Sequence, residues 1–478
     1  MRIEHRRGKV TMSASRRRRR MRAVRSRESS RDTRLDNSLT FIDQGWFAGR
    51  CATGQEEVVQ CVWIYEHAID FDGLKRFHEN LRYGLLGRRI ERSPLPFARD
   101  RWVLDQGASD IDVDEARTRA ELLEWADERS QIPTNSESGP GWHLGIVPLT
   151  DGSTAVSLVA SHYLVDGLGM AGTIADAVAG NRRNLSYPPP HARTRRHAIL
   201  QDLRQRVEDA PEVGRAISAT VRTARHRRDN LVAPPKSRVR PVDSGSSDEV
   251  LVVPSVTIYV DLKDWDARAE LLGGTGRTLV VGFATKLAER LGRRRASDGA
   301  VTLQLPISER TEGDTRAIAV SFARVSTDPA PVTTDLRALR ATIKDALATL
   351  HESPDESLQF FWLTPFMPKR ALKRLSEAAF ADPDLPVFCS DLGHFGPELC
   401  RIDGTDAEPV TARVTRQRVT RGWLERTGGH LTLQSFRIVG KIGISVVAYQ
   451  PGTENTKSAL REVANLTLAD FGLSGNVE

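Results

Sequence analysis

The chain has 478 residues, of which 39% are hydrophobic and 27% are charged, a composition that supports a sizeable core and excludes general disorder. The net charge of +7 is unevenly distributed. Residues 1–34 hold fourteen Lys and Arg against three acidic residues (+11), which leaves 55 basic and 59 acidic residues elsewhere (−4). The folded part therefore lacks the charge of a nucleic-acid-binding body, and nucleic acid is not an expected partner.

Cysteine usage and hydropathy exclude two further classes. The four cysteines are far apart and form no CxxC pair, which argues against a structural zinc site and suits a reducing cytoplasm. No segment offers about 18 apolar residues free of charge, so we expect no transmembrane helix. The N-terminal charges are not followed by the apolar stretch of a secretory signal. We therefore expect a cytoplasmic protein of two or three domains or subdomains.

Residues 1–36 are rich in Arg and Ser, include an unbroken run from Arg16 to Arg20, and lack apolar periodicity, so we predict a disordered tail. Three interpretations of this tail remain open. Translation starts downstream, at Met12 or Met21; or the tail is solvated and has no partner; or it contacts anionic lipid or nucleic acid.

Residues 37–190 have the pattern of a first folded body. Apolar, β-rich runs alternate with helical patterns, and an Asp-Gly pair at 151–152 indicates a hairpin between the last two strands. Asp72 is the expected cap of the first helix. In chain order we expect a strand over 58–65, a helix over 74–85, a helix around 122–126, strands over 142–149 and 155–160, and a helix over 168–178.

Residues 191–250 have the composition of a linker between two bodies. Three prolines at 188–190 precede it, and a basic stretch with helical periodicity covers 193–228. Pro-Pro at 234–235 and a Ser/Gly run at 244–247 close it.

Residues 251–478 have the pattern of a second body, in which five apolar residues from Leu336 to Leu350 share one helical face. The two halves, both mixtures of strands and helices and of related size, suggest a pseudo-dimer in the α/β class. In chain order we expect a strand over 256–260, a helix over 278–291, a strand over 301–305, a helix over 336–350, strands over 412–420, 430–438 and 442–449, and a helix over 454–468.

The candidate catalytic segment is Ser161-His162-Tyr163-Leu164-Val165-Asp166-Gly167, which follows an apolar strand and precedes a helix. His162 at the end of a buried strand is held by a rigid scaffold, and an imidazole can accept a proton at neutral pH. Asp166 can fix the loop or the imidazole, and Gly167 allows a tight backbone path. The ordinary alternative is a polar histidine at a strand end.

This segment resembles the active-site motif of the HHxxxDG acyltransferase superfamily, which includes condensation domains and relatives of chloramphenicol acetyltransferase. The wax ester synthase/diacylglycerol acyltransferase group is the most similar. Three further segments support the resemblance, which covers roughly residues 37–478: Gly139–Leu144, Leu305–Arg310 and Ser390–Pro397. Ser161 replaces the first His of the motif. Asp391 replaces the Asn that the family has in a turn, and the plant-type DFGWG motif is absent.

The resemblance implies two chloramphenicol-acetyltransferase-like subdomains, residues 37–190 and 251–478, with a central tunnel between them. His162 would be the general base, without a covalent intermediate, and Asp166 and Gly167 would complete the motif. Asp166 would pair with Arg310 of the second half, and Ser390 is a candidate donor to the oxyanion.

The same resemblance implies the reactants. The donor would be an acyl thioester of CoA or of an acyl carrier protein. The acceptor would be a small molecule or lipid with a hydroxyl, or less favoured an amine, which leaves peripheral membrane contact open. No cofactor and no metal are expected. The basic stretch 193–228 could contact CoA phosphates or an acidic carrier protein, or it could be a solvated helix face.

Two other functions remain open at this level. One is a condensation-fold protein that binds or docks without catalysis, which the replacements at Ser161 and Asp391 suggest. The other is a nucleic-acid or anionic-membrane binder that acts through the Arg-rich tail.

Overall fold

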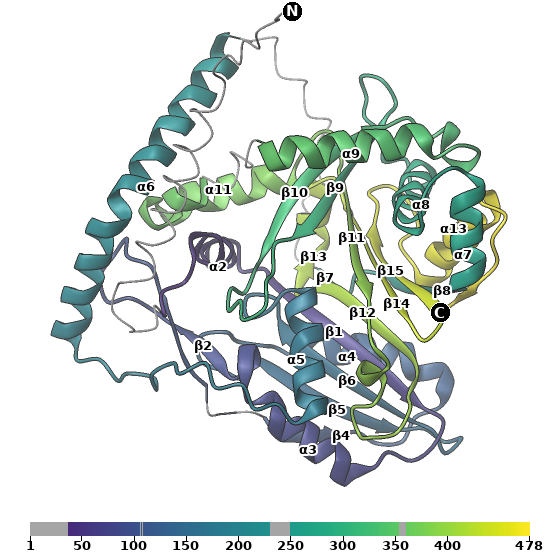
Figure 1. Ribbon diagram of the computed structural model, residues 1–478, viewed down its shortest axis with the longest axis horizontal. Coiled ribbons are helices and arrows are strands. Elements are labelled where there is room, and N and C mark those ends of the chain that lie inside the picture. The colour runs from purple at the N-terminus through teal and green to yellow at the C-terminus, as the bar shows by residue number, and fades with distance from the viewer. Residues whose placement is uncertain (1–36, 106, 108, 230–248, 353–359) are drawn as a thin grey trace, which may run out of the picture. The chain divides into compact units, whose positions relative to one another are not determined.

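Two mixed β-sheets organise the computed structural model, which describes residues 37–478 apart from 106, 108, 230–248 and 353–359 (Figure 1). Residues 38–478 form one unit of the chain. The predicted disordered tail, residues 1–36, lies outside the described residues, as do the Pro-Pro and Ser/Gly stretches of the predicted linker.

The first half supplies most of one sheet and the helices that cover it. Its elements in chain order are α2 (Phe41–Thr53), β1 (Glu56–Tyr65), α3 (Phe71–Leu81), η1 (Gly84–Leu86), β2 (Arg88–Glu91), β3 (Arg101–Leu104), β4 (Ile111–Val113), η2 (Arg119–Glu121), α4 (Leu122–Gln131), β5 (Trp142–Pro148), β6 (Thr154–Ser161) and α5 (Gly167–Ala179).

The second half supplies the other sheet. Its elements, after the long helix α6 (Arg195–Asp229), are β7 (Val250–Leu251), β8 (Ser255–Asp261), α7 (Leu262–Leu271), α8 (Gly276–Arg290), β9 (Val301–Ser308), β10 (Val320–Thr327), η3 (Pro331–Thr333), α9 (Arg337–Glu352), η4 (Phe360–Phe366), α11 (Lys369–Phe380), β11 (Val387–His394), η5 (Pro397–Cys400), β12 (Glu408–Gln417), β13 (Val419–Thr420), α12 (Arg421–Arg426), β14 (His430–Ile438), β15 (Lys441–Tyr449), α13 (Lys457–Asp470) and β16 (Asn476–Val477).

The five-stranded sheet has the order β12-β1-β6-β5-β4 and is covered on both faces. Successive side chains of a strand point to opposite faces, and β1 shows this alternation. Val59, Cys61 and Trp63 lie in the apolar cluster that includes residues of α3 and α5. Val62 and Ile64 pack instead on α4. A strand buried on both faces accounts for its continuous apolar run in the sequence.

The seven-stranded sheet has the order β10-β9-β11-β14-β15-β8-β16. One face carries residues such as Leu431 and Leu433, which pack in a cluster with residues of α7, α8, α9 and α13. The alternate residues of β14, Thr432, Gln434 and Phe436, face the opposite way and line a cavity. This second face meets the first half of the chain.

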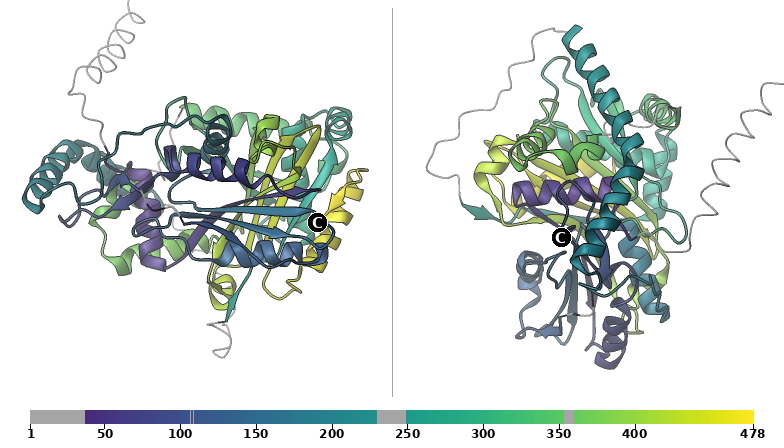
Figure 2. Two further views of the ribbon diagram at one scale, coloured as in Figure 1. Left: turned by 90° about the horizontal axis from the view of Figure 1, so that it is seen from below. Right: turned by 90° about the vertical axis from the view of Figure 1, so that its left-hand side faces the viewer.

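Strand β12 ties the halves together. It comes from the second half but pairs antiparallel with β1, from Glu56 opposite Gln417 to Ile64 opposite Glu408. In the views of Figures 1 and 2 it lies beside β1, at the edge of the first sheet. The apolar cluster on that sheet also includes Phe436 and Ile438 of β14, so the two halves share a core.

Most predicted strands and helices are confirmed, with boundaries shifted by a few residues. The cap assigned to Asp72 was wrong. The α3 helix begins at Phe71, and the side chain of Asp70 accepts hydrogen bonds from the backbone N–H groups of Asp72 and Gly73, at 3.0 and 3.1 Å. Asp72 sits in the first turn, where a carboxylate is also favoured, so the two positions are hard to separate in sequence.

The predicted turn around Ser390 is also wrong. Residues 387–394 form strand β11, which pairs in parallel with both β14 and β9 and has a register shift between Asp391 and His394. Helix α2, which carries Asp43, and strand β10, whose Val320 and Phe322 line the cavity described below, carried no prediction.

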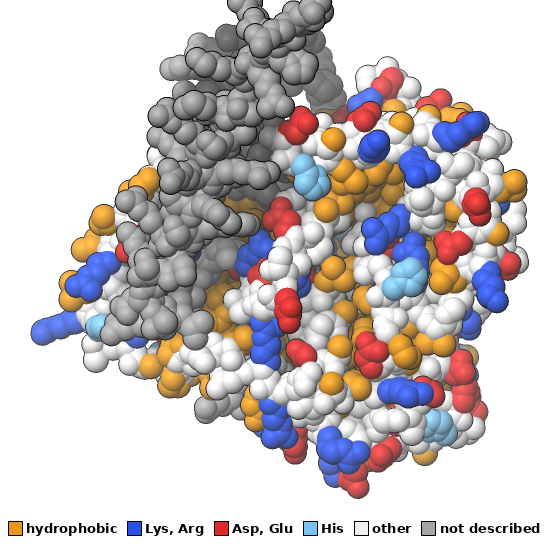
Figure 3. Space-filling model, in the orientation of Figure 1, with side chains coloured by type: hydrophobic (Ala, Val, Ile, Leu, Met, Phe, Trp, Pro, Cys, Tyr) orange, Lys and Arg blue, Asp and Glu red, His pale blue; other side chains and the backbone are white. Residues whose placement is uncertain are grey.

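The basic stretch of the predicted linker forms helix α6, which lies at the periphery, away from both sheets (Figures 1 and 2). Leu200, Leu203 and Val207 are exposed on it. The face of the protein in Figure 3 carries intermixed acidic and basic side chains rather than one basic patch. None of the described helices has the length and apolar character that crossing a bilayer requires. The linker boundaries at 191 and 250 stay predictions.

Candidate active site

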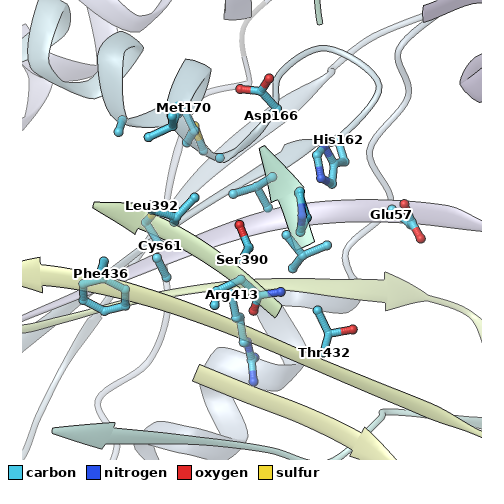
Figure 4. Close-up of a pocket in the computed structure, with 18 of the residues that line it drawn as sticks. Glu57, Cys61, His162, Asp166, Met170, Ser390, Leu392, Arg413, Thr432 and Phe436 are labelled. Atoms are coloured by element: carbon cyan, nitrogen blue, oxygen red, sulfur yellow. The ribbon is translucent and has the colours of Figure 1, made fainter. Parts of the chain in front are cut away.

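A cavity of about 210 Å³ lies between the two halves and receives side chains from both sheets (Figure 4). His162, Asp166 and Gly167 reach it from the first half, and Ser390 from β11. Most of its other wall is apolar, including Val59, Cys61, Trp63, Met170, Ile174, Leu392, Phe395, Val410, Ala412, Phe436 and Ile438. Candidate residues from both halves therefore share one cavity. Whether this cavity opens as a tunnel at both ends stays a prediction.

The end of β6 places His162 on the cavity wall. Its backbone N–H donates to the carbonyl of Glu57 on the neighbouring β1, at 2.8 Å. Its Nδ1 lies 3.0 Å from the backbone carbonyl of Val165. A carbonyl only accepts, so Nδ1 carries the proton of the neutral ring, and Nε2 is left as the basic nitrogen. The imidazole therefore has one fixed tautomer in a half-buried site.

Asp166 is held by four donors from both halves. It caps α5 by accepting from the backbone N–H of Gly169, at 2.7 Å. Arg310 donates to both carboxylate oxygens, from Nε at 3.2 Å and from Nη2 at 2.7 Å, and the N–H of Ala319 donates at 3.0 Å. The predicted partners are thus in contact as a two-pronged ion pair. The Arg310 side chain is 13% exposed and the Asp166 side chain is 7% exposed.

Two residues that carried no prediction hold the same region. Arg88 is fully buried and donates to the carbonyls of Leu164, at 2.9 Å, and of Thr315. Asp43 of α2 accepts from the N–H of Ile318, at 2.9 Å. Burial lowers the pKa of Arg88, and burial raises the pKa of Asp43. An Arg in a short β-rich run was the only signal in the sequence for Arg88.

Gly167 allows close approach of the two halves. Its backbone is not in the left-handed region. A Cβ at this position would lie 2.9 Å from a methyl carbon of Leu392 on β11. The tight backbone path expected here is therefore a tight contact between α5 and the opposite sheet.

Ser390 and Asp391 project to different surroundings. Ser390 lines the cavity, where Figure 4 shows its hydroxyl on the side toward His162. Asp391 accepts from Ser435 at 3.0 Å and pairs with Arg437 at 2.8 Å and with Arg277 at 2.9 Å. These partners all belong to the second half. The Asp that replaces Asn therefore serves an ion-pair cluster beside the cavity.

Ser161, which replaces the first His of the motif, lies away from the cavity chemistry. It is fully buried, and its hydroxyl donates to Glu56 at 2.7 Å. Burial raises the pKa of Glu56, against the opposing effects of Arg50 and Ser161. The Ser161 side chain points toward Glu56, so a histidine side chain with the same direction would not line the cavity.

One end of the cavity is polar. Glu57 pairs with Arg416, and Arg413 pairs with Asp127 at 2.8 Å and donates to Gln60 at 2.8 Å. His430 lines this end; burial and the nearby arginines hold its pKa well below the usual value, so it is neutral at pH 7.

A cysteine also lines the cavity. Burial raises the pKa of the Cys61 thiol to about 12, so at neutral pH it is a protonated and weak nucleophile. Within the described ranges, no group of three or more His, Cys, Asp or Glu side chains is arranged to hold a metal ion.

Comparison with known proteins gives similarity in structure only. The sequence matches no family model, and no curated protein matches it. Polyketide synthase associated protein 5 from Mycobacterium tuberculosis aligns over 91% of this chain and 98% of its own, at 14% identity and a TM-score of 0.53.

Two other solved structures align over similar lengths. Wax ester synthase/diacylglycerol acyltransferase from Marinobacter aquaeolei VT8 matches 91% of this chain and 98% of its own, at 14% identity and a TM-score of 0.51. The first condensation domain of the CDA synthetase matches 93% of this chain and 100% of its own, at 12% identity and a TM-score of 0.52. The chain has the fold of these proteins.

Proposed function

We propose that this protein, which has the condensation-domain fold, is an acyltransferase that moves an acyl group from a thioester to a hydroxyl acceptor. The thioester is carried by CoA or by a carrier protein, and an amine is the alternative nucleophile. Two proteins of the same fold are a wax ester synthase/diacylglycerol acyltransferase and a condensation domain, which favours this reaction class. The acceptor is a lipid or a natural-product scaffold.

The observation that carries the proposal is the state of His162. Its Nδ1 proton is held by the Val165 carbonyl, which leaves Nε2 basic inside a cavity formed by both halves. A base needs this combination of a fixed tautomer and access to a bound hydroxyl. Two halves that both line the cavity can each bring one substrate, which supplies the advantage of proximity.

The reaction follows from this placement. Nε2 takes the proton of the acceptor hydroxyl while the hydroxyl oxygen forms a bond to the carbonyl carbon of the thioester. The Ser390 hydroxyl donates to the resulting oxyanion. Collapse breaks the C–S bond, and the proton on His162 passes to the departing thiolate. The products are an ester and a free thiol, without a covalent enzyme intermediate.

Asp166 and Arg310 act as positioning residues in this scheme. The Asp166 carboxylate accepts hydrogen bonds from Arg310, Gly169 and Ala319, so it is not available to take a proton from the substrate. By capping α5 and joining the halves, it holds the loop that carries His162.

Peripheral membrane contact is a further part of the proposal. Leu200, Leu203 and Val207, spaced at three and four residues, are exposed on α6 with Arg204 and Arg206 in the same turns. An exposed apolar stripe beside basic residues is typical of helices that lie on anionic membranes. Such contact would give the cavity access to a lipid acceptor.

Release of free thiol from a panel of acyl-CoAs tests the proposal. The wild type would be mixed with short to long acyl-CoAs and with alcohol acceptors, and the ester would be identified by mass. We expect thiol and ester in equal amounts, and His162→Ala should release neither above background. An acyl-carrier-protein donor would be run in parallel. Equal thiol release by wild type and His162→Ala, or none by the wild type from either donor, would contradict acyl transfer.

A further inference from the structure

The cavity separates apolar from polar side chains along its length. In the β1–β12 ladder, Glu57 lies opposite Arg416, Val59 opposite Val414 and Cys61 opposite Ala412. Both strands are thus polar at the same end and apolar beyond it, because antiparallel register brings the C-terminal end of β12 beside the N-terminal end of β1.

The opposite wall repeats this gradient. In the parallel β11–β14 pair, Phe388 lies opposite Thr432 and Ser390 opposite Gln434. Leu392 and Phe436 continue the same two strand faces into the apolar end. In Figure 4, Phe436, Cys61, Leu392 and Met170 lie on one side, Glu57 and Thr432 on the other, and Ser390 between them.

Gln434 lies at this boundary between polar and apolar side chains. It is 5% exposed and lines the cavity, yet its Oε1 is buried without a hydrogen-bond partner among the described residues. Its neighbour Thr432, in contrast, is paired with His430 at 2.7 Å. A buried carbonyl oxygen without a hydrogen bond is unfavourable, so its retention on a cavity wall points to a donor supplied by a ligand.

The two arginines that line the cavity carry no unbalanced charge. Arg416 is paired with Glu57, and Arg413 with Asp127, which Lys457 also contacts at 2.7 Å. Because these charges are paired, we expect a ligand to be recognised here by hydrogen bonds and not by charge attraction. Gln434 lies opposite Ser390 on the neighbouring strand, and neighbouring strands are about 4.8 Å apart, so Gln434 is within reach of an acceptor that reacts beside Ser390.

We propose that the acyl chain occupies the apolar end, and that the acceptor is an uncharged molecule whose second hydroxyl or amide, adjacent to the reacting hydroxyl, binds Gln434. This inference rests on the proposed function, because it takes Ser390 and His162 as the reacting centre. In this proposal Gln434 determines specificity, and a vicinal diol is a better acceptor than a simple alkanol.

A matched pair of acceptors tests this inference. The full-length wild type and Gln434→Met, which keeps the side-chain length, would be assayed with 1,2-hexanediol and with 1-hexanol, using one acyl-CoA donor. We expect the wild type to prefer the diol by about tenfold or more in kcat/KM, because a site built to hydrogen-bond a hydroxyl rejects the analogue that lacks it. In Gln434→Met the ratio should fall to about threefold or less, with the donor KM unchanged.

Phe436→Leu serves as the control at the apolar end. It should shift the preferred acyl length and leave the ratio of diol to alkanol unchanged. An equal ratio in wild type and Gln434→Met would overturn the inference. So would a change of donor KM alone, because the polar end would then recognise the thioester carrier instead.

A binding measurement keeps the inference separate from catalysis. Trp46 and Trp63 line the cavity, so titration of the diol and the alkanol can be followed by tryptophan fluorescence without turnover. If the wild type binds the diol more tightly and Gln434→Met does not, while no thioester is turned over, the recognition stands and the proposed reaction fails. If both proteins bind the two alcohols equally, the recognition fails whatever the turnover.

Discussion

The two walls of the cavity hold their polar groups in different ways. On the His162 side, the acidic residue is Asp166, which binds Arg310 from the other half of the chain. On the Ser390 side, it is Asp391, which binds Arg277 and Arg437 of its own half. The loop that carries His162 therefore depends on the association of the halves, whereas the strand of Ser390 is supported locally.

Removing each carboxylate should give the largest effects and tests how much each one contributes to stability. We expect Asp166→Ala to lower the free energy of unfolding by about 3–5 kcal/mol, because it leaves the Arg310 guanidinium buried without a counter-ion. Asp391→Ala also leaves a buried arginine, Arg437, without its carboxylate, but it should cost about 1 kcal/mol less, because only Asp166 also caps a helix. Urea unfolding followed by circular dichroism would measure both.

The control for these variants is Asp406→Ala, which removes an exposed partner of Arg401. Its unfolding midpoint should equal that of the wild type. The comparison would be wrong if Asp391→Ala were as destabilised as Asp166→Ala, or more so.

Ser390→Ala sharpens the comparison on the other wall. Loss of one oxyanion donor typically costs about 10²–10³-fold in kcat, so we expect a decrease of that size with the stability unchanged. Ser435→Ala is the matched variant, because that hydroxyl is on the neighbouring strand but donates to Asp391. It should keep kcat within a few fold. Similar kcat values for both variants would remove Ser390 from the mechanism.

Acid should weaken the first sheet through His143, which lies on β5 beside β6. Burial and Arg129 lower the pKa of His143 to about 4, and its Nδ1 lies 3.1 Å from Arg129. The unfolded chain takes up this proton near pH 6.5, so the stability present above that pH is lost as the pH falls toward 4. The full contribution is about 3 kcal/mol.

Urea unfolding at pH 7.5 and pH 5 would detect this loss. His143→Asn keeps an acceptor for Arg129 but does not titrate, so its stability should fall less between the two pH values. His430→Asn, on the second sheet, should remove a separate part of the acid sensitivity, since its pKa is also lowered. Equal pH dependence in wild type and His143→Asn would contradict the assignment.

The same comparison explains what could be predicted from sequence. His162, Asp166 and Gly167 lie within one short segment of the sequence, and the alternation and helical periodicity around it indicate the strand before it and the helix after it. Arg310 came from a second short motif and lies where that motif implied. These signals are local, because each lies in one short segment at the end of a strand.

The opposite wall was predicted less well, for a physical reason. Asp391 replaces the expected Asn, and its partners Arg277 and Arg437 are over a hundred and over forty residues away. The positioning residues Arg88 and Asp43 meet the loop of the base only after folding. Gln434 is one of many polar residues in β14, and only its unpartnered amide on the cavity wall distinguishes it.

The central claim is that His162 is the base of an acyl transfer. It is tested most directly by comparing wild type and His162→Gln for kcat and for the dissociation constant of the acyl thioester. A positioned base is worth about 10²–10⁴-fold, so kcat should fall by that factor while the dissociation constant stays within about twofold. A kcat within tenfold of the wild-type value would contradict the claim, and so would a loss that appears only in binding.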